Sequence, residues 1–299
     1  NALMTTTSAE DGSFSFENIP YGTWYVREIE QPAGFVLDDT VYPVSIGKDA
    51  QVVEIKIVNK YIRGNIHLTK VDSEYPDNKL TGATFEVYKD SNGSGKLDDG
   101  DELLGTLTEK EIGSYEIKDL FYGRYFVKET KAPEGFVLDT GVYEVMIDTN
   151  GKTCEVENKA GVGFINEAMR GNLKIVKTSS DGKVKGFAFR ITGANGYDII
   201  LETNDKGEIV IDGIRIGDYT ISEVSNSASA MYVLPADKKA TVKTGSTTIV
   251  EMHNVLRDTP KTGDATNLPL LYALAGLSAV GIAVTAFVGF KKKKKEGND

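Results

Sequence analysis

The chain has 299 residues, of which 40% are apolar and 26% charged, so it can form two or three packed domains. Its formal net charge is −10, and Lys291 to Lys295 gather five positive charges at one end, which leaves an acidic remainder and argues against nucleic-acid binding. A single cysteine, Cys154, cannot form an intrachain disulfide, so an extracellular protein of this sequence needs another means of securing its domains.

The first predicted domain spans residues 1–63. It contains YGTWYVREIEQPAGFVLDDTVYPVSI, followed by VVEIKIVNKYIRG. Abundant Tyr, Val and Thr, with Gly, Asp and Pro between the runs, favour short strands joined by turns. Because Asn1 enters this pattern part-way and no signal peptide precedes it, we expect the domain to be truncated at its N-terminus.

The second predicted domain spans residues 64–170 and repeats the first. It opens with GNIHLTKVD, continues with YGRYFVKETKAPEGFVLDTGVYEVMI and closes near GFINEAMRG. Apolar residues alternate at Tyr125 and Val127 and again at Val145 and Ile147, which predicts half-buried antiparallel strands and hairpins.

The third predicted domain spans residues 171–256 and is more diverged. It opens with GNLKIVKTS, contains IGDYTISEV and ends with TTIVEMHNVL. The tripeptide Arg-Gly-Asn marks the start of both the second and the third domain. Several short strands per domain of this size predict an all-β chain of tandem Ig-like sandwiches.

A polar loop in the second domain has spacings like those of an oxygen-ligand calcium loop. Its candidate ligands are Asp90, Asn92, Ser94, Asp98 and Asp101. Asp101 stands where such loops usually carry a bidentate Glu, and a hairpin loop rich in Asn, Gly and Asp explains most of the pattern. We therefore expect no resident cofactor, with calcium as the one alternative.

The C-terminal end predicts attachment to a membrane. A linker, residues 257–267, precedes an uncharged run, residues 268–290, that is long enough to cross a hydrocarbon core of about 30 Å. The basic tail, residues 291–299, is expected on the cytoplasmic side, which places everything before the helix outside the cell.

The linker contains TPKTG, and its order with the helix and basic tail resembles the cell-wall sorting signal of Gram-positive surface proteins. The pentapeptide is similar to LPxTG, with Thr259 in place of Leu and with Pro260, Lys261, Thr262 and Gly263 following. The resemblance implies that a sortase cysteine attacks the Thr262 carbonyl, that Gly263 leaves with the helix, and that Thr262 is joined to peptidoglycan.

The phrase YFVKETKAPEGF resembles the E-box of the Cna B-type, or SpaA-like, surface domains, which have a prealbumin-like fold. The match is close in the second domain, good in the first and partial in the third. The resemblance implies a backbone or accessory pilin, or the stalk of an adhesin.

The same resemblance implies an intramolecular isopeptide bond between a Lys on the first strand and an Asn on the last, formed beside a core Glu. The carried-over Lys residues are Lys70 and Lys177, the Glu residues Glu28, Glu129 and Glu223, and the Asn residues Asn59, Asn166 and Asn254. In the first domain the Lys partner is expected before Asn1. A buried Lys is neutral more readily, and a buried Glu stays protonated more readily, so the chemistry is physically reasonable.

The acceptor of the second domain is ambiguous. Asn158 and Asn166 both end a predicted strand, and Asn166 is preferred because Arg-Gly-Asn follows it at the same spacing as in the first domain.

The function predicted from these features is a nonenzymatic, cell-wall-anchored stalk. Its expected partners are sortase and peptidoglycan, together with a host extracellular-matrix ligand or other pilin subunits. Two alternatives remain: a spacer for a surface enzyme whose catalytic domain lies upstream, and a polymerised pilus backbone, which needs a YPK-type pilin Lys not present in this sequence.

Overall fold

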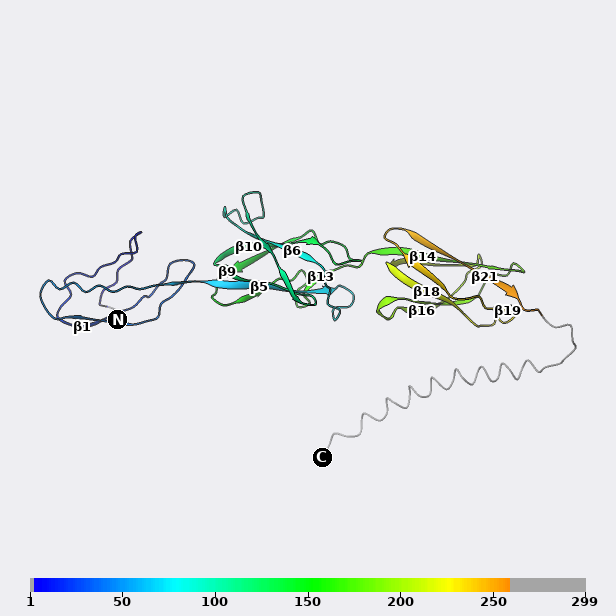
Figure 1. The fold of residues 1–299 in the computed structure, drawn as a ribbon, viewed down its shortest axis with the longest axis horizontal. Helices are drawn as coiled ribbons and strands as arrows, with labels where there is room; N and C mark the ends of the chain where they lie inside the picture. The colour runs from blue at the N-terminus through cyan, green and yellow to red at the C-terminus, as the bar shows by residue number, and fades with distance from the viewer. Residues whose placement is uncertain (1–2, 259–299) are drawn as a thin grey trace, which may run out of the picture.

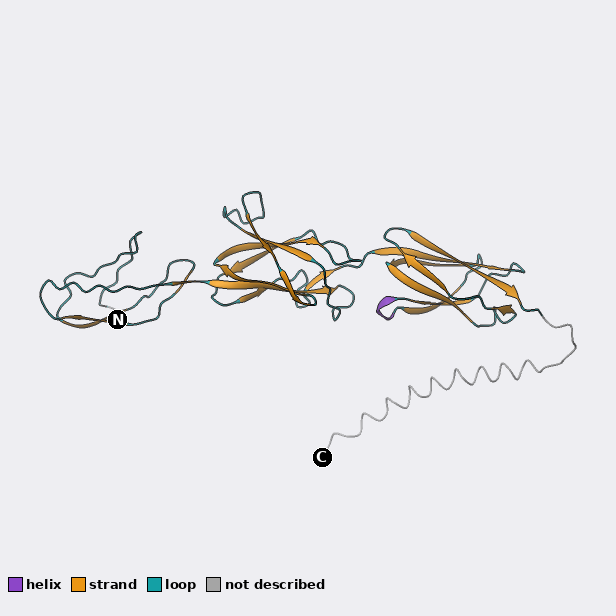
Figure 2. Cartoon of the chain, viewed as in Figure 1, coloured by secondary structure: helices purple, strands orange, loops and turns teal. Residues whose placement is uncertain are grey.

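The computed structural model describes residues 3–258, which form three units arranged one after another along an elongated body (Figure 1). Strands and loops make up these residues apart from a 3₁₀ turn at Ala194–Gly196 (Figure 2). The prediction of tandem all-β domains is therefore confirmed. Within residues 3–258 there is no helix long and apolar enough to span a membrane, and the predicted membrane helix, residues 268–290, lies outside this range.

The second unit is a sandwich of two sheets. One sheet has the order β11-β10-β6-β7, and the other has β12-β5-β9-β8, with β13 also paired to β5. The strands are β5 (Arg63–Asp72), β6 (Thr84–Lys89), β7 (Glu102–Thr106), β8 (Thr108–Glu111), β9 (Ser114–Phe121), β10 (Gly123–Lys131), β11 (Val142–Ile147), β12 (Thr153–Glu155) and β13 (Phe164–Asn166).

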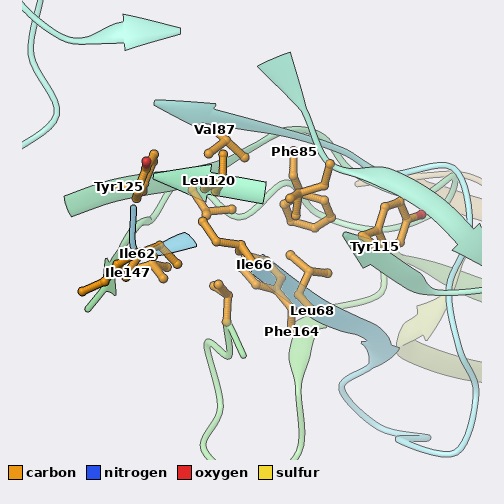
Figure 3. Packing of buried hydrophobic residues seen from close by; sticks show 14 residues of the cluster. Ile62, Ile66, Leu68, Phe85, Val87, Tyr115, Leu120, Tyr125, Ile147 and Phe164 are labelled. Carbon is orange, nitrogen blue, oxygen red and sulfur yellow. The ribbon is translucent and has the colours of Figure 1, made fainter. Parts of the chain in front are cut away.

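The core of the second unit lies between its two sheets. In β5 the buried residues alternate with outward-facing ones, so Ile66, Leu68 and Lys70 all face the interior. Phe85 and Phe164 contact edge to face, with ring centroids 4.9 Å apart, and both are fully buried (Figure 3). The two-residue alternation of β5 thus places apolar side chains and one Lys amine in the same core.

The third unit repeats this architecture. Its sheets have the orders β17-β14-β21-β19 and β16-β15-β18-β20. The strands are β14 (Arg170–Ser179), β15 (Ala188–Thr192), β16 (Asp198–Glu202), β17 (Glu208–Arg215), β18 (Gly217–Val224), β19 (Tyr232–Val233), β20 (Lys238–Val242) and β21 (Thr247–Leu256). A separate apolar cluster fills the space between these sheets, so the second and third units have independent cores.

The last strand differs between these two units. In the third unit, β21 is one ten-residue strand that runs parallel to β14. In the second unit its place is taken by two short strands, β12 and β13, which both run parallel to β5. The segment between them, residues 156–163, leaves the sheet and returns to it.

The first unit carries fewer regular strands than the others. It has two antiparallel pairs, β1 (Gly22–Val26) with β3 (Tyr42–Ile46) and β2 (Phe35–Val36) with β4 (Lys60–Tyr61). The hairpin from β1 to β3 corresponds in register to that from β10 to β11, because Gly22 opposes Ile46 as Gly123 opposes Ile147.

Each junction between units is built around Arg-Gly-Asn. The Nη1 of Arg63 donates to the carbonyl of Asp119, and Arg170 Nη1 donates to that of Gly213. A Cβ on Gly171 would lie 2.2 Å from the Lys243 carbonyl oxygen, so the close chain approach requires glycine there. The tripeptide therefore joins the first strand of each unit to neighbouring turns through hydrogen bonds and close packing.

The two junctions share main-chain hydrogen bonds. Ile62 N–H donates to Gly34 O at 2.8 Å, and Met169 N–H donates to Gly135 O at the same distance. Ile62 O accepts from Tyr122 N–H, as Met169 O accepts from Ile216 N–H. Each connecting segment is thereby bonded both to the unit before it and to the unit after it.

The second junction has an additional ionic contact. Arg215 donates to both carboxylate oxygens of Asp72 at 2.6 Å and to Glu74 at 2.8 Å. The Asp72 side chain is 2% exposed, and the guanidinium lies over the ring of Tyr75. The register equivalent of Arg215 in the second unit is Phe121, because the two oppose Arg170 and Arg63 respectively.

Candidate functional site

The structure places both predicted Lys residues inside their sandwiches. Lys70 is fully buried near the end of β5, and Lys177 is 1% exposed at the equivalent place in β14. Lys70 Nζ donates to the carbonyl of Phe164 at 2.9 Å, and Lys177 Nζ lies 4.2 Å from the centroid of the Phe187 ring. Both amines are therefore removed from water.

Glu129 and Glu223 approach these amines from the opposite sheet. Glu129 follows Tyr125 and Val127 on the inner face of β10, and Glu223 follows Tyr219 and Ile221 on the inner face of β18. The carboxyl group of each thus enters an apolar core because of the same two-residue alternation that buries its neighbours.

Each predicted Asn contacts the Glu of its own unit. Asn166 Nδ2 donates to Glu129 at 2.8 Å, and Asn254 Nδ2 donates to Glu223 at 2.7 Å. In the first unit Asn59 Nδ2 donates to Glu28 at 2.7 Å, although both side chains are only half-buried there. The same Glu–Asn contact therefore recurs in three units.

The first and last strands bring Lys and Asn close together. Phe164 opposes Lys70 and Asn166 opposes Asp72 in the parallel pair β5·β13. In the parallel pair β14·β21, Met252 opposes Lys177 and Asn254 opposes Ser179. In both units the Asn therefore lies two register positions beyond the Lys on the neighbouring strand, with its side chain on the same inner face.

This register distinguishes Asn166 from Asn158. The Glu-to-Asn spacing is 31 residues in the first and third units and 37 in the second. The extra residues lie between Glu155 and Phe164, in the segment that leaves the sheet. Asn158 belongs to that segment and bonds the Asp139 carboxylate and the main chain of Ile165, so Asn166 is the residue that contacts Glu129.

Two oxygen atoms at each buried site have no hydrogen-bond donor among the described residues. These are Glu129 Oε1 and Asn166 Oδ1 in the second unit, and Glu223 Oε2 and Asn254 Oδ1 in the third. A protonated Glu would convert one unpartnered acceptor into a donor directed at the amide. The arrangement is thus suited to a neutral carboxyl group.

Burial shifts the ionisation of these groups in the direction that this chemistry needs. It lowers the pKa of Lys70 to about 8, against the attraction of Glu129, Asp139 and Asp72, and it also lowers the pKa of Lys177. Burial raises the pKa of Glu129 and of Glu223, against the hydrogen bonds from Asn166 and Asn254. Burial therefore shifts the Lys and the Glu of each unit toward their neutral forms.

Comparison with known families gives a match along most of the chain. The model of the SpaA domain, described as a prealbumin-like fold domain, matches residues 2–61, 64–160 and 171–256. The chain belongs to the SpaA prealbumin-like family. The resemblance read from the E-box phrases is therefore confirmed.

Two relatives of this SpaA-family chain come from Streptococcus and Staphylococcus, and one of them is named as a surface protein. It is 26% identical over 204 residues to the trypsin-resistant surface T6 protein of Streptococcus pyogenes, covering 58% of this chain and 35% of the relative. It is 26% identical over 155 residues to serine-aspartate repeat-containing protein F of Staphylococcus epidermidis, covering 47% of this chain and 9% of the relative. The chain thus spans only part of these relatives.

A solved structure shares the fold of these SpaA-like units. The Bacillus anthracis TIE protein superposes with a TM-score of 0.60 at 25% identity, over 84% of this chain and 44% of that protein.

The structure also brings together a trio on the outer face of the second SpaA-like unit that sequence reading missed. His67 contacts Glu155 through Nδ1 at 2.6 Å and Ser114 through Nε2 at 2.9 Å. At the position equivalent to His67, three residues after the glycine that opens the unit, the third unit has Lys174 paired with Glu208 at 2.6 Å. We therefore interpret the trio as a cross-strand polar contact; only the pairing of β5 with β9 and β12 reveals it.

The remaining predicted site residues fall in two places. The motif residues 259–263 lie outside the described range. The candidate calcium ligands lie in the loop between β6 and β7. Among residues 3–258, His, Cys, Asp and Glu side chains alone form no group of three or more that could hold a metal ion.

Proposed function

We propose that the second and third units each form a Lys–Asn isopeptide bond, Lys70 with Asn166 and Lys177 with Asn254. The observation that carries the proposal is the repeated trio of buried Lys, buried Glu and buried Asn, with the Asn amide bonded to the Glu in both units. Burying a charged Lys is costly, and formation of the amide bond removes that charge.

The proposed reaction balances as a transamidation. The neutral Lys Nζ attacks the Asn Cγ, a new amide bond forms between them, and the Asn Nδ2 leaves as ammonia. The protonated Glu donates a hydrogen bond to the Asn carbonyl oxygen and carries the proton lost by the Lys amine to the departing nitrogen. The reaction happens once per unit, so it is maturation and not turnover.

The mass of the intact, denatured full chain tests this proposal. Two bonds lower the mass by two ammonia molecules relative to the sequence. Glu129→Ala and Glu223→Ala each restore one ammonia, and the double variant restores both. An unreduced mass for the unaltered chain contradicts the proposal.

We further propose that the chain is the wall-anchored stalk of a surface protein. Three observations support this role: membership of the SpaA family, a relative named as a surface protein, and the order of the motif 259–263, the apolar run 268–290 and Lys291 to Lys295. Sortase would join Thr262 to peptidoglycan, and the stalk would hold a distal region that binds a host ligand or other pilin subunits. Its function is then mechanical and nonenzymatic.

Anchoring is tested in a Gram-positive host that expresses a sortase. Thr262→Ala is expected to leave the protein in the membrane fraction or to release it into the medium, whereas Lys261→Ala changes only the variable position of the motif. Wall attachment of the Thr262→Ala protein at the unaltered level contradicts sortase anchoring.

A further inference from the structure

The contact between Arg215 and Asp72 lies beside the buried site of the second unit. Lys70 and Asp72 are two residues apart on β5, so their side chains point to the same inner face, and both are buried. Asn166 opposes Asp72 in the pairing of β5 with β13. The Asp72 carboxylate is therefore adjacent in the sheet to the Lys and to the Asn, and the guanidinium that pairs with it comes from the third unit.

The charge of Asp72 acts on the Lys70 amine. Burial lowers the pKa of Lys70 to about 8, and the negative charges of Glu129, Asp139 and Asp72 oppose this shift because they favour the ammonium form. The Asp72 side chain is 2% exposed, so water and salt screen its charge little. An unpaired Asp72 carboxylate would therefore hold more of the amine in its charged form, which cannot attack an amide.

Arg215 offsets this charge from the neighbouring unit. Its Nη1 and Nη2 donate to the two carboxylate oxygens of Asp72, each at 2.6 Å. Asp72 Oδ1 also accepts from the main-chain N–H of Glu74 at 2.9 Å, which fixes the carboxylate but brings no full positive charge. A bidentate ion pair has a weaker field at a third charge than a lone carboxylate has, because its two members act with opposite sign.

The third unit balances the corresponding charge from within itself. Ser179 takes the place of Asp72, two residues beyond Lys177. Asp181, which also attracts the Lys177 amine, is 22% exposed and forms an ion pair with Lys183 of the same unit at 3.3 Å. The second unit therefore takes this balancing charge from its neighbour, and the third unit does not.

We propose that Arg215 is a positioning residue for the Lys70–Asn166 bond, acting across the junction by neutralising Asp72. This inference rests on the isopeptide bond proposed above. Docking of the third unit favours the uncharged amine, which then attacks the Asn166 Cγ and releases ammonia as before. Arg215 itself exchanges no atom or proton. The second unit is thus expected to mature only after the third has folded against it.

Cell-free synthesis of the full chain in a mild detergent tests this order. Synthesis is stopped, samples are quenched in denaturing acid at intervals, and mass spectrometry quantifies separately the tryptic peptides joined through Lys70–Asn166 and through Lys177–Asn254. We expect Arg215→Met to slow the Lys70–Asn166 bond by about tenfold at about pH 7, because a lone carboxylate raises the pKa of a neighbouring Lys by about one unit or more. The Lys177–Asn254 bond in the same molecules should form at the unaltered rate.

Asp72→Asn separates charge balance from the joining of the two units. The double variant Arg215→Met/Asp72→Asn still lacks the ionic contact, but no carboxylate remains to be neutralised. We expect it to form the second-unit bond within about twofold of the unaltered rate. Arg190→Met, which removes an exposed cation of the third unit, is the matched control and should change neither rate.

The pH profile gives a readout that a purely structural role would not move. At about pH 9 the slowing in Arg215→Met should shrink to about twofold, because much of the amine is then neutral in either chain. A slowing that persists at this pH reports impaired folding and overturns the proposal.

Two further results would overturn the role of Arg215 and leave the isopeptide bond in place. One is an equal rate of second-unit bond formation in the unaltered and Arg215→Met chains. The other is a double variant that is as slow as Arg215→Met, since Arg215 would then act only by holding the units together. An unaltered chain without the peptide joined through Lys70–Asn166 overturns the bond and this inference together.

Discussion

The second and third units reach the same core arrangement with different last strands. The third uses the continuous strand β21, whereas the second uses β12 and β13. Between β12 and β13, residues 156–163 leave the sheet and return to it; we call this segment the detour. In both units the Asn lies two register positions beyond the Lys and bonds the core Glu. Strand register, and not distance along the chain, therefore determines which Asn meets the Glu.

The surroundings of the two sites differ as well. In the second unit Asp139 N–H donates to Glu129 at 2.8 Å, and the Asp139 carboxylate accepts from Asn158 and Tyr143. The first unit has the same contacts from Asp38 to Glu28 and from Tyr42 to Asp38. The Glu223 of the third unit is bonded by Asn254. The turn after the E-box thus supports the Glu in the first two units.

Removing the proposed Lys–Asn bond should lower the free energy of unfolding more than any other change. The loss should be similar in the second and third units. Lys70→Met or Lys177→Met abolishes the link between the first and last strands, and the free energy of unfolding of the affected unit is expected to fall by about 4 to 5 kcal/mol. Denaturant unfolding, read together with intact mass, measures it. Lys174→Met, on the outer face of β14, is the matched control, and an equal loss in that variant contradicts the proposal.

Arg215 tests the contact that joins the two units. Arg215→Ala leaves the Asp72 carboxylate buried without its partner, which is expected to destabilise the second unit by about 3 kcal/mol. Arg190→Ala, which removes an exposed partner of Asp198, should cost less than about 1 kcal/mol. Denaturant unfolding of both variants measures the difference. Equal losses would show that the Arg215–Asp72 contact stabilises the protein no more than an exposed ion pair does.

The detour of the second unit is tested by two Asn substitutions. Asn158→Ala removes three hydrogen bonds and should destabilise the second unit by about 1 to 3 kcal/mol while leaving the mass deficit intact. Asn166→Ala should restore one ammonia to the mass. If Asn158→Ala restores the ammonia instead, the assignment of the acceptor from register is wrong.

The smallest expected effect is a pH dependence of the free energy of unfolding in variants that cannot form the Lys–Asn bond. It compares the free Lys70 with the free Lys177. The free Lys70 of the folded chain has a pKa of about 8 against an ordinary value of 10.5, and Asn166→Ala keeps this amine free. Between these values the unfolded chain binds more protons, so stability should rise with pH. Glu129 has a raised pKa, so it contributes the opposite slope at lower pH, where stability falls as it ionises.

Urea unfolding of Asn166→Ala between about pH 7 and pH 10 measures this slope. Adding Lys70→Met should remove the rise. Asn254→Ala reports the same property for Lys177, whose pKa is lowered in the same direction. A rise that persists without Lys70 would assign the slope to another group.

Sequence reading reached the fold through alternation and repetition. The inward positions of GNIHLTK and GNLKIVK follow a period of two, so the burial of Lys70 and Lys177 could be expected once the strands were assigned. The Glu–Asn contacts followed from family resemblance and equivalent spacing in the first and third units.

Other features could not be read in this way because they depend on strand pairing. The detour between β12 and β13 changes the spacing without changing the register, which left Asn158 and Asn166 open. The Arg215–Asp72 contact joins residues 143 positions apart on different units, and the His67 trio joins three strands. Such contacts have no periodic signal along the sequence.

The Arg-Gly-Asn junctions determine how such units add up in length. Each connecting residue is hydrogen-bonded to the unit on either side, so little slack remains for one unit to swing against the next. Height above an attachment point should therefore increase in equal steps with the number of units. A protein built in this way works as a ruler, and its reach can evolve by gaining or losing one repeat.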